Sequence, residues 1–184
     1  MFTLTALSTF AGVDPVHHFQ GALFAVRTGS DTAYMYEEAP AGDGDAWAIV
    51  EVDPDRFLQL WRQPSSSHPE VVHQSPATWP QDRKFHWPHQ HFAQGRVNPV
   101  PLATVSCELQ HWPLESVMGC DDTTDRPVLS FTDGVTRTIW LLTHCVKVMP
   151  VKCPMPDVAR LQALAGVEGG QPVAVGTLFK QQMG

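Results

Sequence analysis

The stretch FTDGVTRTIWLLTHCVKVMPVKC, residues 131–153, decides the expected fold of this chain. It connects an apolar segment at 128–131, which has the size of a buried strand, to an apolar helix expected at 136–146. A second apolar strand follows at 148–153, where Pro150 favours an edge position or a bulge. Sixteen residues separate the two strands, which is enough for one helical crossover between neighbouring parallel strands.

One face of this helix is apolar and is expected to pack on the sheet. Trp140 lies instead on the polar side, between Thr136 and Lys147. It is either covered by the N-terminal part of the chain or exposed as an anchor for a partner, and the usual burial of large aromatic residues favours the first alternative. The residues of the apolar face are Ile139, Leu141, Leu142, Cys145 and Val146.

The turn before the helix has the composition of an anion site. Gly134 permits a tight turn and the close approach of a ligand. The free N–H groups and the positive end of the helix macrodipole favour phosphate, to which Arg137 could add a charged fork. The simpler alternative is that Thr132 or Asp133 caps the helix and that Arg137 pairs with a nearby carboxylate.

The N-terminal half predicts two strands and a helix. Residues 19–27 and 47–53 have strand composition, and a long polar connection would fit an antiparallel pair. Residues 54–63 predict a helix because Asp53 can cap it, Pro54 suits its first position, and apolar residues follow at helical spacing.

The remaining segments are less regular. Residues 64–101 contain seven prolines and form either a long functional loop or a set of short turns. Further along, we expect a strand around 101–107, a short helix at 113–118, a polar loop at 119–126 and a helix from 157 to about 164.

Composition limits the classes of function. With 184 residues, 43% apolar and 17% charged, the chain suits one globular domain. The net charge of −7 and the scattered basic residues argue against duplex DNA binding by a basic stripe. No apolar run is long enough to span a membrane, and the first residues lack signal-peptide features, so we expect no membrane insertion and a cytoplasmic location.

The four cysteines have no metal or redox spacing and are expected to be reduced and mostly buried.

The segment DRKFHWPHQHFAQGR, residues 82–96, is locally basic and rich in aromatic residues. It is either a weak contact for phosphate or single-stranded nucleic acid, or an ordinary surface loop, which the acidic balance of the chain favours. His89 and His91 alternate as on one face of a strand, and His86 could complete a metal trio. Histidines in proline-broken loops are usually solvated, so the sequence identifies no metal.

The sequence DGVTRTIWLLTHCVKVMPV (133–151), with NPVPL (98–102) upstream, resembles the ParB/sulfiredoxin superfamily. The resemblance implies an α+β fold with a small mixed sheet, a βαβ crossover and an N-terminal strand and helix extension. We accordingly expect one domain over 1–184. Its parts would be an elaboration at 1–97, a ParB/sulfiredoxin-like core at 98–153, and a C-terminal helix and strand at 154–184.

Three segments together resemble the plasmid fertility inhibition factors of the Osa and FiwA group: PATWPQDRKF (76–85), GRVNPVPLA (95–103) and DGVTRTIWLL (133–142). This narrower resemblance includes Asp82 and Lys84. It implies a bacterial, plasmid-encoded, cytoplasmic protein that blocks conjugative DNA transfer through another plasmid's type IV secretion system. The implied partner is the coupling protein or another component of that system.

The resemblance also leaves an enzymatic alternative open, because the Osa group is associated with ATPase and DNase activity. In that alternative Arg137 and Lys84 stabilise developing phosphate charge, while Asp82 or Asp133 positions a divalent metal such as Mg²⁺, or water. The ATP phosphates would be bound by Asp133, Gly134, Thr136 and Arg137.

Two departures from the superfamily pattern narrow these expectations. Val135 stands where sulfiredoxin carries its catalytic cysteine, so sulfinate reduction is excluded. Thr136 replaces the usual basic residue or histidine before the arginine, and its hydroxyl contributes no charge to nucleotide binding.

Overall fold

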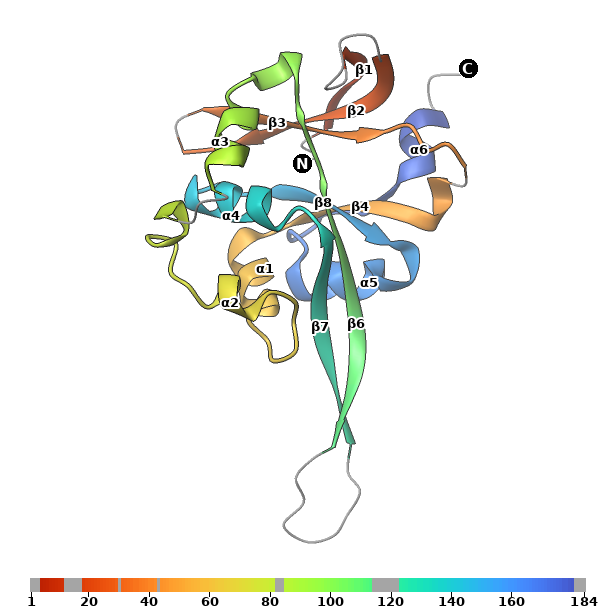
Figure 1. Ribbon diagram of the computed structural model, residues 1–184. Helices are drawn as coiled ribbons and strands as arrows, with labels where there is room; N and C mark the ends of the chain where they lie inside the picture. The colour runs from red at the N-terminus through yellow and green to blue at the C-terminus, as the bar shows by residue number, and fades with distance from the viewer. Residues whose placement is uncertain are drawn as a thin grey trace, which may run out of the picture.

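The computed structural model combines two β-sheets with several short helices, which confirms the predicted α+β class (Figure 1). In the part of the chain that the structure describes, no helix is both long and apolar enough to cross a membrane. The described residues are 4–11, 18–29, 31–42, 44–81, 85–113 and 123–180.

The first sheet has the strand order β1-β2-β3-β5. β1 (Leu4–Ala11), β2 (His18–Arg27) and β3 (Thr32–Glu38) form an antiparallel meander, and the two-residue β5 (Val100–Pro101) adds to β3 in parallel. This sheet forms the upper layer of the molecule in Figure 1.

The second sheet is mixed and has the order β7-β6-β8-β4-β9. β4 pairs antiparallel with β8 and β9, and β6 pairs antiparallel with β7 but parallel with β8. Its strands are β4 (Trp47–Val52), β6 (Ala103–Pro113), β7 (Thr123–Asp133), β8 (Met149–Pro154) and β9 (Val173–Ala174).

The predicted crossover between neighbouring parallel strands is wrong. Helix α4 (Val135–Thr143) does join β7 to β8, but β6 lies between these two strands, which run in opposite directions. β7 folds back on β6 as a hairpin before the helix begins, so the parallel neighbours are β6 and β8. β8 is also not an edge strand, and Pro150 lies outside its short register with β6, which joins only two residue pairs.

The predicted pairing of residues 19–27 with 47–53 is also wrong, because the two strands lie in different sheets. The missing element is β3, which pairs with β2 through a short turn. Its side chains alternate between buried and half-buried, which places Ala33, Met35 and Glu37 on the inner face. The sequence TAYMYEE was not predicted as a strand, because one of its inward residues is an acid and interrupts the alternation of apolar and polar residues.

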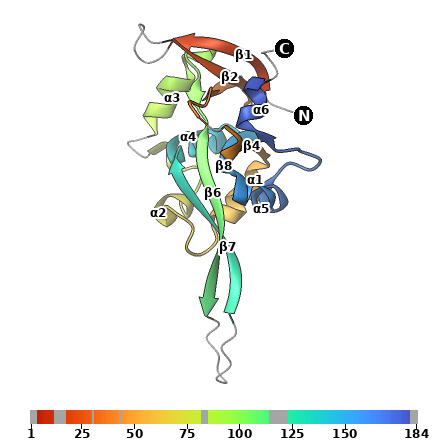
Figure 2. The ribbon, with the colours of Figure 1, turned by 90° about the vertical axis from the view of Figure 1, so that its right-hand side faces the viewer.

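Two helices pack on the second sheet, α1 (Pro54–Trp61) against β7 and α5 (Met155–Ala165) against β4 and β6 (Figure 2). Both confirm predicted helices. The rings of Trp61 and Phe131 are in contact, with centroids 4.6 Å apart and planes inclined at 48°, so α1 packs directly on β7. The β6–β7 hairpin extends well beyond the helices in both views.

The described residues between 64 and 99, which are 64–81 and 85–99, form turns and short pieces of helix before β5 begins, as in the second alternative for that segment. Residues 114–118 of the predicted helix at 113–118 and residues 119–122 of the predicted loop at 119–126 lie outside the described residues. The rest of that loop prediction is wrong, because β7 already begins at Thr123. The remaining elements are η1 (Gly44–Ala46), α2 (Pro69–Val72), η2 (Trp79–Gln81), α3 (His86–Phe92), η3 (Gly95–Val97) and α6 (Val175–Lys180).

The assignment to the ParB/sulfiredoxin superfamily stays a prediction, as does the division into 1–97, 98–153 and 154–184. One observation bears on how the parts interact. β4, from the N-terminal part, lies in the same sheet as β8 and pairs with it along its whole length.

Replacing Asp53 by alanine is expected to lower the free energy of unfolding by about 1 kcal/mol. The Asp53 carboxylate accepts hydrogen bonds from the backbone N–H groups of Asp55 and Arg56, both at 2.9 Å, at the first turn of α1. Urea denaturation measures the loss. Asp55→Ala, an exposed first-turn control, should cost less than about 0.5 kcal/mol, and equal losses for both variants would contradict the capping role.

Candidate functional site

The predicted phosphate-binding turn forms an open hollow at the N-terminal end of α4. Its volume is about 260 Å³, and it is lined by residues 131–136 and by His68. Thr136, which is half-buried, contributes a hydroxyl, and the first turn of α4 contributes N–H groups. The structure therefore places Asp133, Gly134 and Thr136 around one hollow, and their binding of phosphate stays a prediction.

Gly134 is the N-cap of α4 and has φ of 98° and ψ of 12°, in the left-handed region that favours glycine. A Cβ at this position would lie 2.6 Å from the Cα atom of Ala103 and 2.8 Å from Nε of Arg137. The glycine is thus required for the close packing of α4 against β6, whether or not the hollow binds a ligand.

The guanidinium of Arg137 is turned toward the protein. Its Nη2 donates to the carboxylate of Asp133 and, at 3.3 Å, to the carbonyl of Leu102. The Arg137 side chain is 14% exposed, whereas that of Asp133 is 69% exposed. In the simpler alternative, the pairing of Arg137 with a carboxylate therefore agrees with the structure. The capping of α4 by Thr132 or Asp133 is wrong, because the N-cap is Gly134 and has no side-chain hydrogen bond. An anion in the hollow would meet the acid first.

The catalytic roles predicted for Asp82 and Lys84 fall on residues outside those described, so these roles stay predictions, as does ATP binding. The histidine alternation is wrong because His86, His89 and His91 lie on helix α3, where residues two apart point to different sides. Within the described ranges, no group of three or more His, Cys, Asp or Glu side chains is placed to hold a metal.

Helix α3 nevertheless presents an aromatic surface. The Trp87 side chain is 55% exposed, and the rings of His86 and His91 lie with their centroids 5.0 Å and 6.4 Å from it. A weak contact with single-stranded DNA on this surface stays a prediction.

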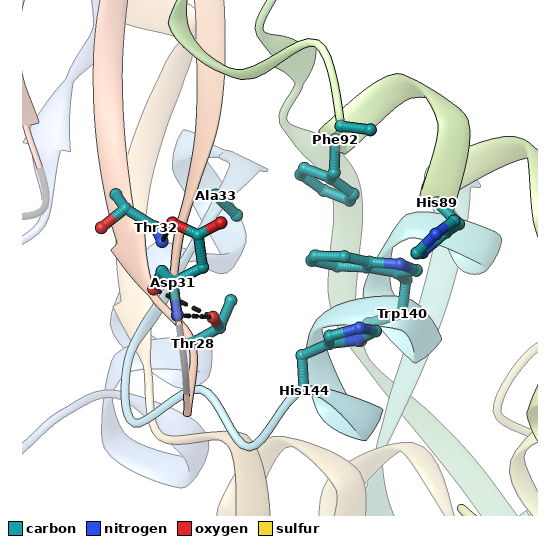
Figure 3. Close-up of a pocket in the computed structure, with 9 residues that line it drawn as sticks. Thr28, Asp31, Thr32, Ala33, His89, Phe92, Trp140 and His144 are labelled. Carbon is teal, nitrogen blue, oxygen red and sulfur yellow. Dashed lines mark hydrogen bonds between the residues drawn. The ribbon is translucent and has the colours of Figure 1, made fainter.

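A second cavity of about 260 Å³ lies at the opposite end of α4, between the β2–β3 turn and helices α3 and α4 (Figure 3). We call it the Trp140 pocket. Figure 3 shows its two walls: polar side chains from the β2–β3 turn face the aromatic side chains of the two helices. The walls carry Thr28, Asp31 and Thr32 on one side and Phe92, Trp140 and His144 on the other.

The aromatic wall is a continuous stack. The Trp140 ring lies between the rings of Phe92 and His144. The ring centroids are 4.1 Å apart for Phe92 and 3.7 Å apart for His144, and the angles between the ring planes are 22° and 18°. Trp140 is only 7% exposed, so the expectation that it is covered is correct, and α3 supplies the cover. Its Nε1 has no hydrogen-bond partner among the residues that the structure describes.

Hydrogen bonds fix the shape of the β2–β3 turn and connect it to the C-terminal end of α4. The N–H and the hydroxyl of Thr28 both donate to the carbonyl of Asp31 at 2.9 Å, and the Asp31 N–H donates back to the same hydroxyl. The N–H of Gly29 donates to the carbonyl of His144 at 2.9 Å. Sequence reasoning missed this pocket, although the TGSD turn chemistry offered a local signal.

An ion pair connects the two sheets. Lys152 of β8 donates to the carboxylate of Glu37 on the inner face of β3, and its ammonium group lies 5.2 Å from the centroid of the Trp47 ring. The two side chains are 24% and 11% exposed. Burial raises the pKa of Glu37 above its usual value, while the bond and charge of Lys152 act in the opposite direction. We interpret this pair as structural.

Two of the predicted buried thiols, Cys107 and Cys153, are in their protonated, weakly nucleophilic form. Burial raises the pKa of Cys107 to about 11 and that of Cys153 to about 12, so both remain protonated at neutral pH. Cys145 is exposed, contrary to its expected place on the apolar face of α4, because the helix ends at Thr143 and Cys145 adopts φ of 54°. Cys120 lies outside the described residues.

Comparison with known proteins gives three matches. The sequence model of the plasmid fertility inhibition factors matches residues 49–166, which is 118 of the 184 residues. Protein osa of Shigella flexneri is 42% identical over 72 residues, covering 39% of this chain and 31% of that protein. The matched segment thus spans about a third of the length of this curated relative.

The third match is structural. The fold is similar to the crystal structure of Oncogenic Suppression Activity Protein, a plasmid fertility inhibition factor, in a gold(I) cyanide derivative. The TM-score is 0.67 at 26% sequence identity, and the match covers 97% of this chain and 83% of that chain. The similarity therefore extends to β1, β2 and β3, which lie outside the family match.

Proposed function

The chain belongs to the family of plasmid fertility inhibition factors, and from this premise we propose that it blocks conjugative DNA transfer through another plasmid's type IV secretion system. The proposed target is the coupling protein of that system, in the cytoplasm of the donor cell. The observation that carries the proposal is the family match over residues 49–166, which includes the whole of α4 and the hollow at its N-terminal end.

The geometry at the N-terminal end of α4 favours inhibition by binding over inhibition by hydrolysis. Arg137 is already neutralised by Asp133, and this carboxylate faces the hollow in which a phosphate would sit. A phosphate in this hollow would lie beside the negatively charged Asp133 carboxylate, which disfavours its binding. A nucleotide would have to displace Arg137 from Asp133 or bring a metal ion to offset the acid.

Hydrolysis of nucleotide or transferred DNA is the second candidate function. The free N–H groups at the start of α4 and the hydroxyl of Thr136 favour it, since both are suited to bind phosphate oxygens. This function also requires Asp82 and Lys84 in the roles predicted from the sequence.

Replacing Arg137 by alanine separates the two candidates. If the protein acts by binding, the variant still lowers conjugation frequency when it is produced in donor cells at the wild-type level, because the guanidinium is turned inward, toward Asp133 and Leu102. Arg137→Lys is the matched control for charge. If soluble, stable Arg137→Ala protein loses both nucleotide hydrolysis and inhibition of transfer, the proposal of inhibition by binding is wrong.

The proposed partner is tested by affinity capture. Tagged protein is isolated from donor cells that carry a susceptible conjugative plasmid, and the coupling protein is expected to be enriched. Donor cells whose plasmid lacks the coupling-protein gene serve as the control. Inhibition of transfer without this enrichment would contradict the coupling protein as the target.

A further inference from the structure

The Trp140 pocket has the charge character of a cation site. None of its nine lining residues is Lys or Arg, whereas Asp31 contributes a carboxylate. His144, on the other wall, is the C-cap of α4 and lies at the negative end of the helix macrodipole. The net charge of −7 adds a long-range attraction for cations. The pocket therefore differs from the hollow at the other end of α4, where the dipole is positive.

Hydrogen-bond acceptors lie on both walls. The exposed Asp31 carboxylate uses Oδ1 to accept the Thr32 N–H at 2.7 Å, which leaves its other lone pairs for a ligand. Nδ1 of His144 lies 2.7 Å from the carbonyl oxygen of Trp140, so in the neutral ring Nδ1 carries the hydrogen. Nε2 of His144 is then an acceptor.

The size and the aromatic wall select among cations. A cavity of about 260 Å³ is smaller than the pockets of roughly 300 Å³ and more that hold drug-sized ligands, so it suits a single side chain. The stacked rings of Phe92 and Trp140 offer an apolar surface to an aliphatic stem. A guanidinium carries five donors in one plane and is weakly hydrated, and it can therefore reach acceptors on two facing walls.

We propose that the Trp140 pocket binds a guanidinium group between Asp31 and the Phe92–Trp140–His144 stack. Such a group comes either from free arginine or from an arginine side chain on a protein. In the second case, which rests on the proposed function, the pocket holds an arginine of the coupling protein and contributes to its capture. The walls are already fixed by the hydrogen bond from Gly29 to His144, so binding requires little rearrangement.

Binding is tested with N-acetylarginine methylamide, followed by NMR through the indole Nε1–H signal of Trp140, which Trp140→Phe identifies. The neutral isostere N-acetylcitrulline methylamide is the matched ligand control. We expect the arginine derivative to shift the Trp140 signal and the citrulline derivative to bind at least about ten-fold more weakly, as for the loss of one charge-assisted hydrogen bond. Equal binding of the two ligands, or no shift with either, would overturn the proposal.

The role of Asp31 is tested with Asp31→Asn, which keeps the oxygen that accepts the Thr32 N–H and removes the charge. Affinity for the arginine derivative should fall at least about ten-fold, while Asp55→Asn, an exposed change on α1, should leave it unaltered. Unaltered affinity in Asp31→Asn with native thermal stability would contradict the site.

The two sources of the guanidinium give different results in donor cells. If it belongs to the coupling protein, Asp31→Asn captures less of that protein than Asp55→Asn does. If the pocket takes free arginine, capture is unchanged and only the NMR response is lost, which refutes the protein source. Failure of the wild-type capture alone would contradict the proposed partner but leave the NMR result standing, so the two failures are distinguishable.

Discussion

Replacing Gly134 by alanine is expected to lower the free energy of unfolding by about 4 kcal/mol, or to abolish cooperative folding. Two costs combine at this position. The backbone has φ of 98°, which residues with a Cβ adopt only under strain, and the new Cβ would lie 2.6 Å from the Cα atom of Ala103. Because the obstructing atom belongs to the backbone of β6, α4 would have to move away from the sheet.

Two glycines serve as controls for the separate costs. Gly95 also has a positive φ, of 60°, but open space around a Cβ, so Gly95→Ala should cost only about 1 kcal/mol. Gly42 has open space and no positive φ, and Gly42→Ala should stay within about 0.5 kcal/mol. Urea denaturation gives all three values. A loss at Gly134 no larger than that at Gly95 would refute the close packing of α4 on β6.

Breaking the ion pair between the sheets is expected to have the second largest effect. Lys152→Met or Glu37→Leu alone should lower the free energy of unfolding by about 3 kcal/mol, because each leaves the other group buried without its charged partner. The double variant should recover most of that loss. Glu70→Gln, which removes an exposed partner of His68, is the control and should cost less than about 1 kcal/mol. Additive losses in the double variant would contradict the pairing.

The pH dependence of this pair has a definite sign. In the folded protein, burial raises the pKa of Glu37 above 4.5, the usual value for a solvent-exposed glutamate. A group whose pKa is higher in the folded state contributes stability below its unfolded pKa, and that contribution is lost as the pH rises through its folded pKa. Relative to the double variant, the wild-type protein should therefore lose stability as the pH increases above 4.5. A difference that stays constant would contradict the raised pKa.

Elements with strong local signals could be predicted from the sequence. Helix α1 has a capping acid, a proline at its first position and apolar residues at helical spacing, and all three act within one turn. The turn at Gly134 was predicted for the same reason. The sequence also raised the pairing of Arg137 with a carboxylate, and the partner Asp133 stands four residues before it, a spacing that places the two on one helix face.

Features that depend on distant residues could not be predicted. β3 places Glu37 inward because Lys152, 115 residues away in the chain, neutralises it from the other sheet. β6 lies between β7 and β8 because β6 and β7 pair as a hairpin, and β8 then pairs with the other side of β6. In the same way, Asp31 and His144 share a pocket only because the β2–β3 turn hydrogen-bonds to the end of α4.

The conjugation frequency of a susceptible plasmid tests the central claim most directly. The protein is produced at matched levels either in donor cells or in recipient cells, and transfer to recipients is counted. We predict that transfer falls when the protein is in the donor, which contains the proposed target, and is unchanged when the protein is in the recipient. Undiminished transfer from donors that contain soluble, folded protein would contradict the proposed function.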